Sequence, residues 1–423
     1  MTALPLHLLP DSSEVASDGR LHIGGCDTIE LAERHGTPLF VYDEGHLRSR
    51  CRETVSEMGE GAVYAAKAFL CRAMARLVHE EGMRLDVATG GEMHVARSAG
   101  FPAERMVVHG NNKSTSELRM ALESGVGRLV IDSFEEIDRI ERLVGEGLPA
   151  PRVLVRITPG VEAHTHEYIA TGQDDSKFGF TVSTGAAQEA ADRVASSTSM
   201  SLLGFHSHIG SLVFRVESFA EALGAVAGFA RPYGLPELSM GGGLGVPYVA
   251  GERAPTIADW CATLKQQARH LGIRSALSVE PGRSIAAGAA VTLYRIGTVK
   301  RIAGVRTYVA VDGGMSDNPR PVLYGSGYET FLPHRVSDAR PETIRLVGKH
   351  CESGDMLVRE GSLPSGFAVD DFVATPVTGA YGHSMGSNYN KVPRPAVVFV
   401  KDGHSRLVVR RETFDDLLGT DVG

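Results

Sequence analysis

The sequence predicts two structural parts, a (β/α)8 barrel of the TIM type and an all-β domain in the form of a barrel or sandwich. Three observations lead to this prediction. β-Prone runs alternate with helical stretches over the first two-thirds of the chain, reactive side chains fall at the ends of these runs, and the last third has many β-prone runs with little helical periodicity. A chain of 423 residues has room for a barrel of about 250 residues and a second domain.

Eight β-prone runs define the predicted barrel. They are residues 62–66, 85–88, 106–109, 129–132, 153–157, 202–206, 237–240 and 276–280. Helical periodicity separates them, for example in residues 92–99, 116–124 and 134–143, where Ser or Asp near the start is a typical cap. Alternating strands and helices form parallel sheets, and eight repeats over about 220 residues match a closed barrel better than the alternative, an open doubly wound sheet.

The residues at the ends of these strands favour the barrel. Those at or just past the ends are Lys67, Asp86, His109, Asp132, His208, the three glycines 241–243 and Glu280. Active sites of barrels are built at the carboxyl ends of the strands. We therefore expect these residues to contribute to one site.

The β-prone runs after Pro281 predict the second domain. They are residues 291–299, 306–311, 343–347, 372–378, 396–400 and 406–410. Residues 21–23 and 38–42 also have strand character and are expected to complete this domain from the N-terminal side. We predict that residues 45–285 form the barrel and that residues 1–44 and 286–423 form the β domain.

Charge, hydropathy and cysteine content restrict the class of function. The 43 Lys and Arg residues are outnumbered by 51 Asp and Glu, and the net charge of −8 argues against a nucleic-acid partner. No long apolar run indicates a membrane span, and residues 4–9 lack the basic lead-in of a secretory signal. The five cysteines form no C-x-x-C pair, and their odd number fits reduced thiols. We expect a cytoplasmic protein that binds neither nucleic acid nor membrane.

Lys67 directly follows the first barrel strand and lies between two alanines. A lysine that points into a pocket from a strand end loses solvation, which lowers its pKa and suits it to form an imine with a carbonyl compound such as pyridoxal phosphate. The alternative is an ordinary surface lysine, which is the commoner role of this residue type.

Two further segments at strand ends suit a phosphorylated ring. Residues 241–245 read Gly-Gly-Gly-Leu-Gly, and glycine N–H groups approach anions closely, although a plain tight turn is the alternative. The segment does not match G-x-G-x-x-G, so a dinucleotide fold is not supported. Glu280 can keep a pyridine nitrogen protonated and Arg283 can bind a phosphate or carboxylate, whereas a surface ion pair is the alternative for both.

Two patterns imitate other kinds of site. Residues 382–386 match the G-x-S-x-G elbow of serine hydrolases, but the prolines that follow prevent the required helix, and Asp402 and His404 are too close in sequence for a triad. His164 and His166 alternate in a predicted loop without further ligands at metal-binding spacing. We predict neither a hydrolase nor a metal site.

Nine segments in order resemble the fold type III pyridoxal-phosphate-dependent decarboxylases, and in particular the diaminopimelate decarboxylases. They are residues 64–69, 110–114, 177–180, 206–211, 241–245, 280–283, 315–324, 351–355 and 379–381. Phe69 and residues 408–413 resemble the actinobacterial branch. The resemblance covers nearly the whole chain. It implies an alanine racemase-like fold and decarboxylation of meso-2,6-diaminopimelate to L-lysine, in lysine biosynthesis, through a Schiff base with pyridoxal 5′-phosphate.

The resemblance also implies roles for particular residues. Lys67 carries the cofactor, and Cys351 protonates the substrate carbon after reaching the site from the partner subunit of a homodimer. The implied cofactor-binding residues are Lys67, Asp86, His208, Ser211, Gly243, Glu280, Gly282, Arg283 and Tyr381. The implied substrate-binding residues are Arg283, Arg320, Tyr324, Glu352 and Tyr381. Arg320 offers two donors to the distal carboxylate and Glu352 accepts from the distal ammonium, so both groups of a second amino-acid head are recognised.

Two departures from the resemblance leave the substrate open. Leu212 stands where the family commonly has glutamine, and Gly382 and His383 follow Tyr381 where relatives often have other residues. A decarboxylase of another amino acid and a non-catalytic pyridoxal-phosphate-binding protein are therefore alternatives. An amino-acid racemase is disfavoured because residues 351–355 resemble decarboxylases.

Overall fold

The computed structural model describes residues 3–160 and 175–423, and in this part the chain divides into two units. Unit 1 comprises Met1–Ser49, Val246–Arg253 and Ile285–Gly423, and unit 2 comprises Arg50–Gly245 and Ala254–Ser284. The placement of Val246–Arg253 in unit 1 was not predicted. It follows from contacts within unit 1, where the Tyr248 ring packs 5.4 Å from that of Tyr328 and the Ala250 N–H donates to Glu329.

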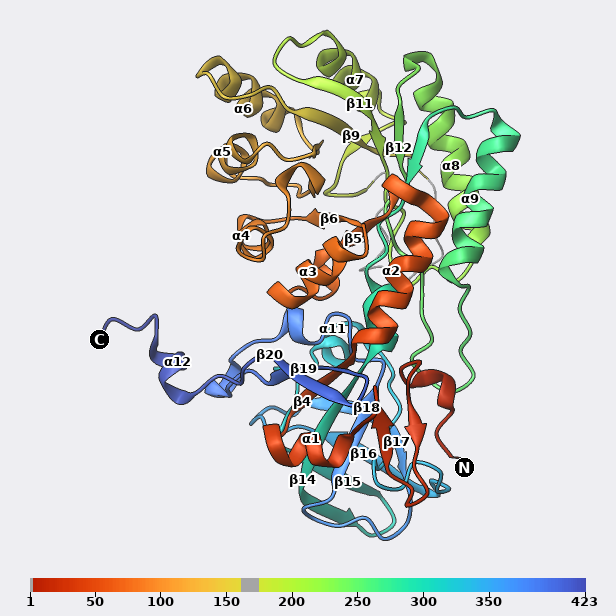
Figure 1. Cartoon of the computed structure of the whole chain (residues 1–423), viewed down its shortest axis with the longest axis vertical. Helices are drawn as coiled ribbons and strands as arrows, with labels where there is room; N and C mark the ends of the chain where they lie inside the picture. The colour runs from red at the N-terminus through yellow and green to blue at the C-terminus, as the bar shows by residue number, and fades with distance from the viewer. Residues whose placement is uncertain (1–2, 161–174) are drawn as a thin grey trace. The chain divides into compact units, whose positions relative to one another are not determined.

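Eight parallel strands form the barrel of unit 2 (Figure 1). They are β5 (Val63–Ala65), β6 (Arg84–Val87), β7 (Met106–Val108), β8 (Arg128–Ile131), β9 (Arg152–Thr158), β11 (Ser201–His206), β12 (Glu237–Ser239) and β13 (Ala276–Ser278). A parallel bridge between Ala62 and Val279 joins the first strand to the last. All eight predicted strands and the predicted fold class are confirmed. The short strand β10 (Phe180–Thr181), which pairs with β9, was not predicted.

Helices of unit 2 lie on the outer side of these strands (Figure 1). They include α3 (Arg72–Glu80), α4 (Gly90–Ser98), α5 (Thr115–Ser124), α6 (Phe134–Gly145), α7 (Ala186–Ser196), α8 (Val216–Ala230) and α9 (Ile257–Leu271). Their starts follow the capping rules: Ser114 caps α5 with Glu117 in a reciprocal capping box, and Ser133 caps α6. The three helices predicted from periodicity are confirmed.

The barrel interior gives the strand ends a rigid base. Val63, Val107, Val130 and Leu154, from β5, β7, β8 and β9, form one buried cluster. Gly204 in β11 permits a close approach to β12, because a Cβ there would lie 1.8 Å from the Glu237 carbonyl oxygen. These contacts join the strands beneath their carboxyl ends.

A buried ion pair fixes the loop that follows β7. Lys113 and Glu136 are each 2% exposed at the side chain and lie 2.7 Å apart, Nζ to Oε1. The Lys113 ammonium also donates to the carbonyl oxygens of Gly110 and Val130, at 2.7 Å each. Since Gly110 directly follows His109, the pair anchors a predicted site residue to the neighbouring strand.

Unit 1 is built on a mixed sheet of eight strands. They are β4 (Leu39–Asp43), β14 (Ala290–Ile302), β15 (Arg306–Val311), β16 (Glu342–Val347), β17 (Met356–Leu363), β18 (Phe372–Pro376), β19 (Ala396–Lys401) and β20 (His404–Val409). The N-terminal strand β4 pairs antiparallel with β14 and parallel with β19, so the predicted strand at residues 38–42 belongs to this sheet. Strand β17 was missed because its centre, Arg359-Glu360-Gly361, breaks the apolar pattern.

The remaining elements of unit 1 are short. Strands β1 (Glu14–Val15), β2 (Leu21–Ile23) and β3 (Cys26–Asp27) form a small sheet beside α1 (Thr28–His35), and α11 (Arg320–Tyr324) and α12 (Phe414–Leu418) follow later in the chain. Helices α2 (Glu44–Met58) and α10 (Arg283–Ala286) each contain a boundary between the two units.

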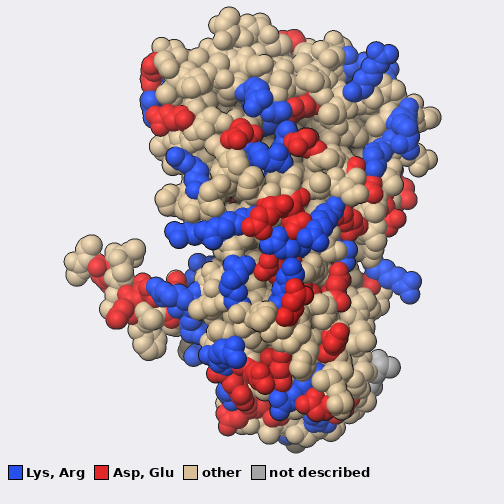
Figure 2. Space-filling view, viewed as in Figure 1, with Lys and Arg blue, Asp and Glu red and all other residues tan. Residues whose placement is uncertain are grey.

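Charged side chains of both signs are interspersed on the face shown in Figure 2. In unit 2, for example, Arg193 lies 2.6 Å from both Asp138 and Glu141. Exposed pairs of this kind contribute little stability individually. None of the helices in the described ranges is both long and apolar enough to cross a bilayer.

We predict that Lys113→Met lowers the free energy of unfolding by about 3 kcal/mol or more, because it leaves the Glu136 carboxylate buried without its cation. The control is Arg119→Met, which breaks the exposed pair with Glu146 and should cost below about 1 kcal/mol. Urea unfolding of the variants measures both. Equal losses would show that burial does not determine the strength of the Lys113 pair.

Candidate active site

Three strand ends of unit 2 bring a carboxylate and two histidines together. Glu280 follows β13, His109 directly follows β7, and His206 ends β11. The Glu280 carboxylate lies 3.3 Å from His109 Nε2 through Oε1 and 3.1 Å from His206 Nε2 through Oε2. Ser239, the last residue of β12, donates to Oε1 at 3.0 Å. Asp86 of β6 lies at the edge of the cluster, 3.9 Å from His109 Nε2.

The electrostatics of the cluster favour an ionised Glu280. Burial alone would raise the pKa of Glu280, but the charge of His109 and the close contacts with both histidines outweigh burial and hold the pKa well below its usual value. Burial lowers the pKa of His206 to about 4, so we assign this ring as neutral. For His109, burial is outweighed by the charges of Asp86 and Glu280, which raise its pKa. Burial raises the pKa of Asp86.

Arg156 of β9 supplies a further buried cation and was not predicted. Its guanidinium lies 3.5 Å from Asp132 and packs 4.3 Å from the Phe178 ring centroid. Asp132, a predicted strand-end residue, also accepts the Gly179 N–H at 2.6 Å. Burial lowers the pKa of Arg156, while Asp132 and other nearby carboxylates oppose this shift. An arginine within a strand offers no periodic signal that distinguishes it from a surface residue.

Lys67 lies in the 3-10 helix Ala66–Ala68, directly after β5. The prediction that a buried position desolvates this lysine is wrong, because its side chain is exposed while Ala66 and Ala68 are buried. Lys67 interacts electrostatically with a nearby histidine instead. Burial holds the pKa of His208 well below its ordinary value, and the charge of Lys67 adds to that shift. Lys67 therefore lies within electrostatic reach of the strand-end groups.

The loop at residues 241–243 has a backbone that only glycine allows. Gly243 has φ of +116°, and a Cβ on Gly242 would lie 2.2 Å from the Glu280 carbonyl oxygen. The Gly242 N–H donates to His208 Nδ1 at 3.2 Å. The loop thus packs directly against two predicted site residues and presents main chain to the site.

Arg283 and Ser211 form a polar pair beside this loop. The Arg283 guanidinium donates to Ser211 Oγ at 2.9 Å, and Arg283 is 8% exposed. Gly282 lets the segment approach the Lys67 turn, because a Cβ there would lie 3.0 Å from the Ala65 Cβ. Leu212, next to Ser211, has φ of 59°, a left-handed conformation that is unusual for leucine.

Arg320 is the most distinctive predicted residue of unit 1. It begins α11 and is 1% exposed. Its guanidinium carbon lies 4.1 Å from the Tyr248 ring centroid and 5.5 Å from that of Tyr328, and its Nη1 donates to the Tyr328 hydroxyl. Within the described ranges no carboxylate pairs with Arg320. A buried guanidinium without a carboxylate partner is a candidate anion-binding group.

The turn that carries Cys351 and Glu352 is exposed and follows β16. Asp355 organises it, because its carboxylate accepts the N–H of His350 at 2.9 Å and that of Met315 at 2.7 Å. Two segments singled out in the sequence, residues 315–324 and 351–355, are therefore joined by one buried carboxylate. Among the described residues, the donors to the Glu352 carboxylate come from its own turn, Ser353 and Gly354.

The remaining predicted residues of unit 1 are half-buried. Tyr324 ends α11, and Tyr381 has φ of 63° and lies two residues before the 3-10 helix His383–Met385. No α-helix follows this turn in residues 383–395, so the elbow pattern lacks the structure that a hydrolase needs. His164 and His166 lie outside the described residues.

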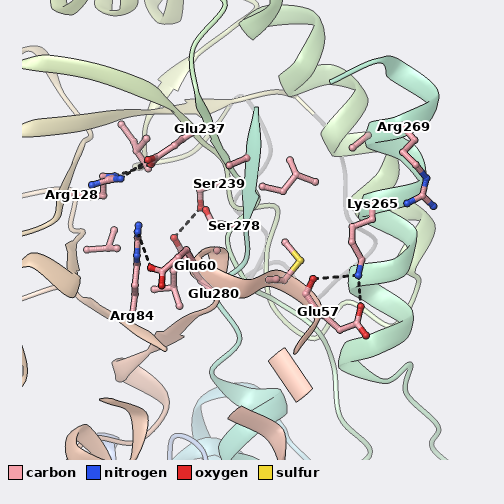
Figure 3. A pocket seen from close by; sticks show the side chains of 18 residues that line it. Glu57, Glu60, Arg84, Arg128, Glu237, Ser239, Lys265, Arg269, Ser278 and Glu280 are labelled. Carbon is pink, nitrogen blue, oxygen red and sulfur yellow. Dashed lines mark hydrogen bonds and ion pairs between the residues drawn. The ribbon is translucent and has the colours of Figure 1, made fainter. Parts of the chain in front are cut away.

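Two arrangements in unit 2 were not predicted. His109, His206 and Glu280 place three possible metal-ligand atoms within 4.8 Å of one another. A cavity of about 470 Å³ also opens toward the amino-terminal ends of the strands. Figure 3 shows its charged lining in pairs, including Arg84 with Glu60 at 3.3 Å. It reaches Ser239 and Glu280 from the side opposite the strand-end loops.

The residues of unit 2 fit the three functional groups of pyridoxal phosphate. Glycines 241–243 form a tight main-chain loop in which any Cβ would clash with neighbouring residues, and Ser211 and Arg283 add a hydroxyl and a cation for a phosphate. The ionised Glu280 suits a protonated pyridine nitrogen. Lys67, directly after β5, carries the amine that would bond to the aldehyde. The predicted residues that lie in unit 2 are Lys67, Asp86, His208, Ser211, Gly243, Glu280, Gly282 and Arg283.

Comparisons with known proteins agree with this fit. The family described as "Pyridoxal-dependent decarboxylase, pyridoxal binding domain" matches residues 44–287. The diaminopimelate decarboxylase of Mycobacterium tuberculosis is 48% identical, covering 99% of each chain, and that of Bacillus subtilis is 44% identical, covering 98% of each. The crystal structure of the M. jannaschii diaminopimelate decarboxylase with L-lysine has a TM-score of 0.90 at 32% identity, covering 98% of each chain. The chain belongs to the family of pyridoxal-dependent decarboxylases, alongside its members named diaminopimelate decarboxylase.

Proposed function

We propose that the chain decarboxylates meso-2,6-diaminopimelate to L-lysine and carbon dioxide. The observation that carries the proposal is the buried guanidinium of Arg320, which has tyrosine neighbours and no carboxylate partner in the described ranges. A substrate with a second carboxylate, distant from the reacting carbon, would supply the missing anion. Relatives named for this activity, at 44–48% identity over nearly the full length, support the same substrate.

The residues of the barrel would hold the cofactor and control its charge. Pyridoxal phosphate supplies an electron sink for the electron pair that remains when carbon dioxide leaves. Lys67 would hold the aldehyde carbon, and the Glu280 carboxylate would keep a proton on the ring nitrogen. His208 would pack on the ring, with Asp86 beside the Lys67 end. Ser211, Gly243, Gly282 and Arg283 would bind the phosphate end.

The residues of unit 1 would recognise the distal amino-acid head. Arg320 would donate two hydrogen bonds to the distal carboxylate, and Glu352 would accept from the distal ammonium. Tyr324 and Tyr381, both half-buried, would also contact the substrate, as would Arg283. Lysine and ornithine lack the distal carboxylate, so they would leave Arg320 buried without an anion, which is costly.

Cys351 is the proposed proton donor, and it would act in the site of a second copy of the chain. Cys351 and Glu352 are exposed in the single chain, whereas a group that passes a proton to a carbanion needs shielding from bulk water. A two-fold dimer in which each β domain completes its partner's site would provide that shielding. The free, mostly buried cysteines favour a reducing compartment, and we propose the cytoplasm.

Arg320→Met should lower kcat/KM for diaminopimelate roughly ten- to a hundredfold while the cofactor absorbance stays unchanged, because one charge-assisted contact is lost. Arg301→Met, which alters a half-exposed pair with Glu342, is the control and should have no effect. Product analysis with diaminopimelate, lysine, ornithine and arginine tests the function directly. If the wild type decarboxylated lysine or ornithine as fast as diaminopimelate, recognition of the distal carboxylate and ammonium would be contradicted.

Mixed dimers test the proposed exchange of residues between subunits. Lys67→Ala and Cys351→Ala homodimers should both be nearly inactive. Random exchange of equal amounts makes about half the dimers mixed, each with one intact site, so activity should return to about a quarter of wild type. No recovery after verified exchange would place Cys351 in its own chain's site or outside the chemistry.

A further inference from the structure

Ser239 connects two parts of the candidate site that the proposed function assigns to opposite ends of the cofactor. Its hydroxyl donates to Glu280 Oε1 at 3.0 Å and accepts the Gly241 N–H at 3.4 Å. The residue is 1% exposed and ends β12. One buried hydroxyl therefore links the carboxylate at the ring nitrogen to the glycine loop at the phosphate.

The backbone reinforces this link. The Glu280 N–H donates to the Gly241 carbonyl oxygen at 2.8 Å, so the two segments are hydrogen-bonded through the main chain as well. A hydroxyl can donate one hydrogen bond while it accepts another, which an alanine or valine at this position could not do. The parallel pairing of β12 with β13 places Ser239 opposite Ser278 and next to the Glu280 segment.

Ser239 differs in kind from the two histidines beside Glu280. His109 and His206 are ionisable rings that lie 3.3 and 3.1 Å from the carboxylate. The serine hydroxyl is neutral at any ordinary pH, so it can fix the orientation of Oε1 without adding charge. Ser239 and Glu280 both line the amino-terminal cavity (Figure 3).

We propose that Ser239 is a positioning residue that holds the Glu280 carboxylate and the glycine loop in register, so that ring-nitrogen protonation and phosphate binding depend on one hydroxyl. This inference rests on the proposed function only in that the bound group is pyridoxal phosphate. It assigns no substrate contact to Ser239, which acts through Glu280 and through the Gly241 main chain.

The test compares Ser239→Thr with Ser239→Val, two side chains of the same shape that differ in the hydroxyl. In Ser239→Val, the 15N signal of cofactor labelled at the pyridine nitrogen should shift toward the unprotonated ring, and the cofactor dissociation constant should rise roughly tenfold. Ser239→Thr should keep both values within about twofold of wild type. Valine also fills the space that water from the cavity could enter.

Ser278→Val is the matched control, because Ser278 lines the same cavity on the neighbouring strand and its side chain does not bond to Glu280. It should leave the 15N signal and the cofactor affinity unchanged. If Ser239→Val does not fold, Ser239→Ala gives the same comparison and should show the same two shifts.

The inference would be overturned if Ser239→Val kept the wild-type 15N signal and cofactor affinity. Equal losses of cofactor affinity in Ser239→Thr and Ser239→Val would also overturn it, because they would point to packing and not to the hydroxyl. Failure of the proposed function is recognised separately. If the wild type forms no lysine from diaminopimelate while the Ser239 variants still shift the nitrogen signal, the substrate assignment is wrong and the role of Ser239 stands.

Discussion

The architecture of unit 2 depends on keeping one carboxylate ionised in a buried place. Burial of Glu280 would by itself favour its neutral form, and the paired histidines reverse that preference. This arrangement requires β7, β11 and β13 to end at the same level, which closure of the barrel between Ala62 and Val279 provides. The Lys113–Glu136 pair and the packed interior then hold the strand ends at that level.

The buried charge of unit 1, the Arg320 guanidinium, has a different kind of environment. Arg320 and Glu280 are both buried, but the neighbours of Arg320 include the rings of Tyr248 and Tyr328. Aromatic faces stabilise a cation without neutralising it. Glu280 thus has charged and polar partners within the barrel, whereas Arg320 has tyrosine neighbours and no carboxylate partner among the described residues. This contrast underlies our assignment of cofactor chemistry to the barrel and of substrate recognition to Arg320.

The features of the fold that could be predicted from the sequence are those with a local signal. The eight barrel strands, the helix caps and the reactive residues at strand ends each leave a signal within a few residues of the chain. The contacts that define the site depend instead on register between distant strands. The link from Ser239 to Glu280 follows from the pairing of β12 with β13, and the contact of Tyr248 with Arg320 joins residues far apart in sequence. The exposure of Lys67 was predicted wrongly because a strand-end position alone does not determine burial.

The ionisation of Glu280 is the central claim, and infrared difference spectroscopy tests it directly. Subtracting the spectrum of Glu280→Gln from that of the wild type at neutral pH isolates the stretching bands of this side chain. The account predicts the paired bands of an ionised carboxylate, which should persist as the pH falls below the ordinary pKa of glutamate, since the pKa is depressed. The carbonyl band of a protonated carboxylic acid at neutral pH would contradict it.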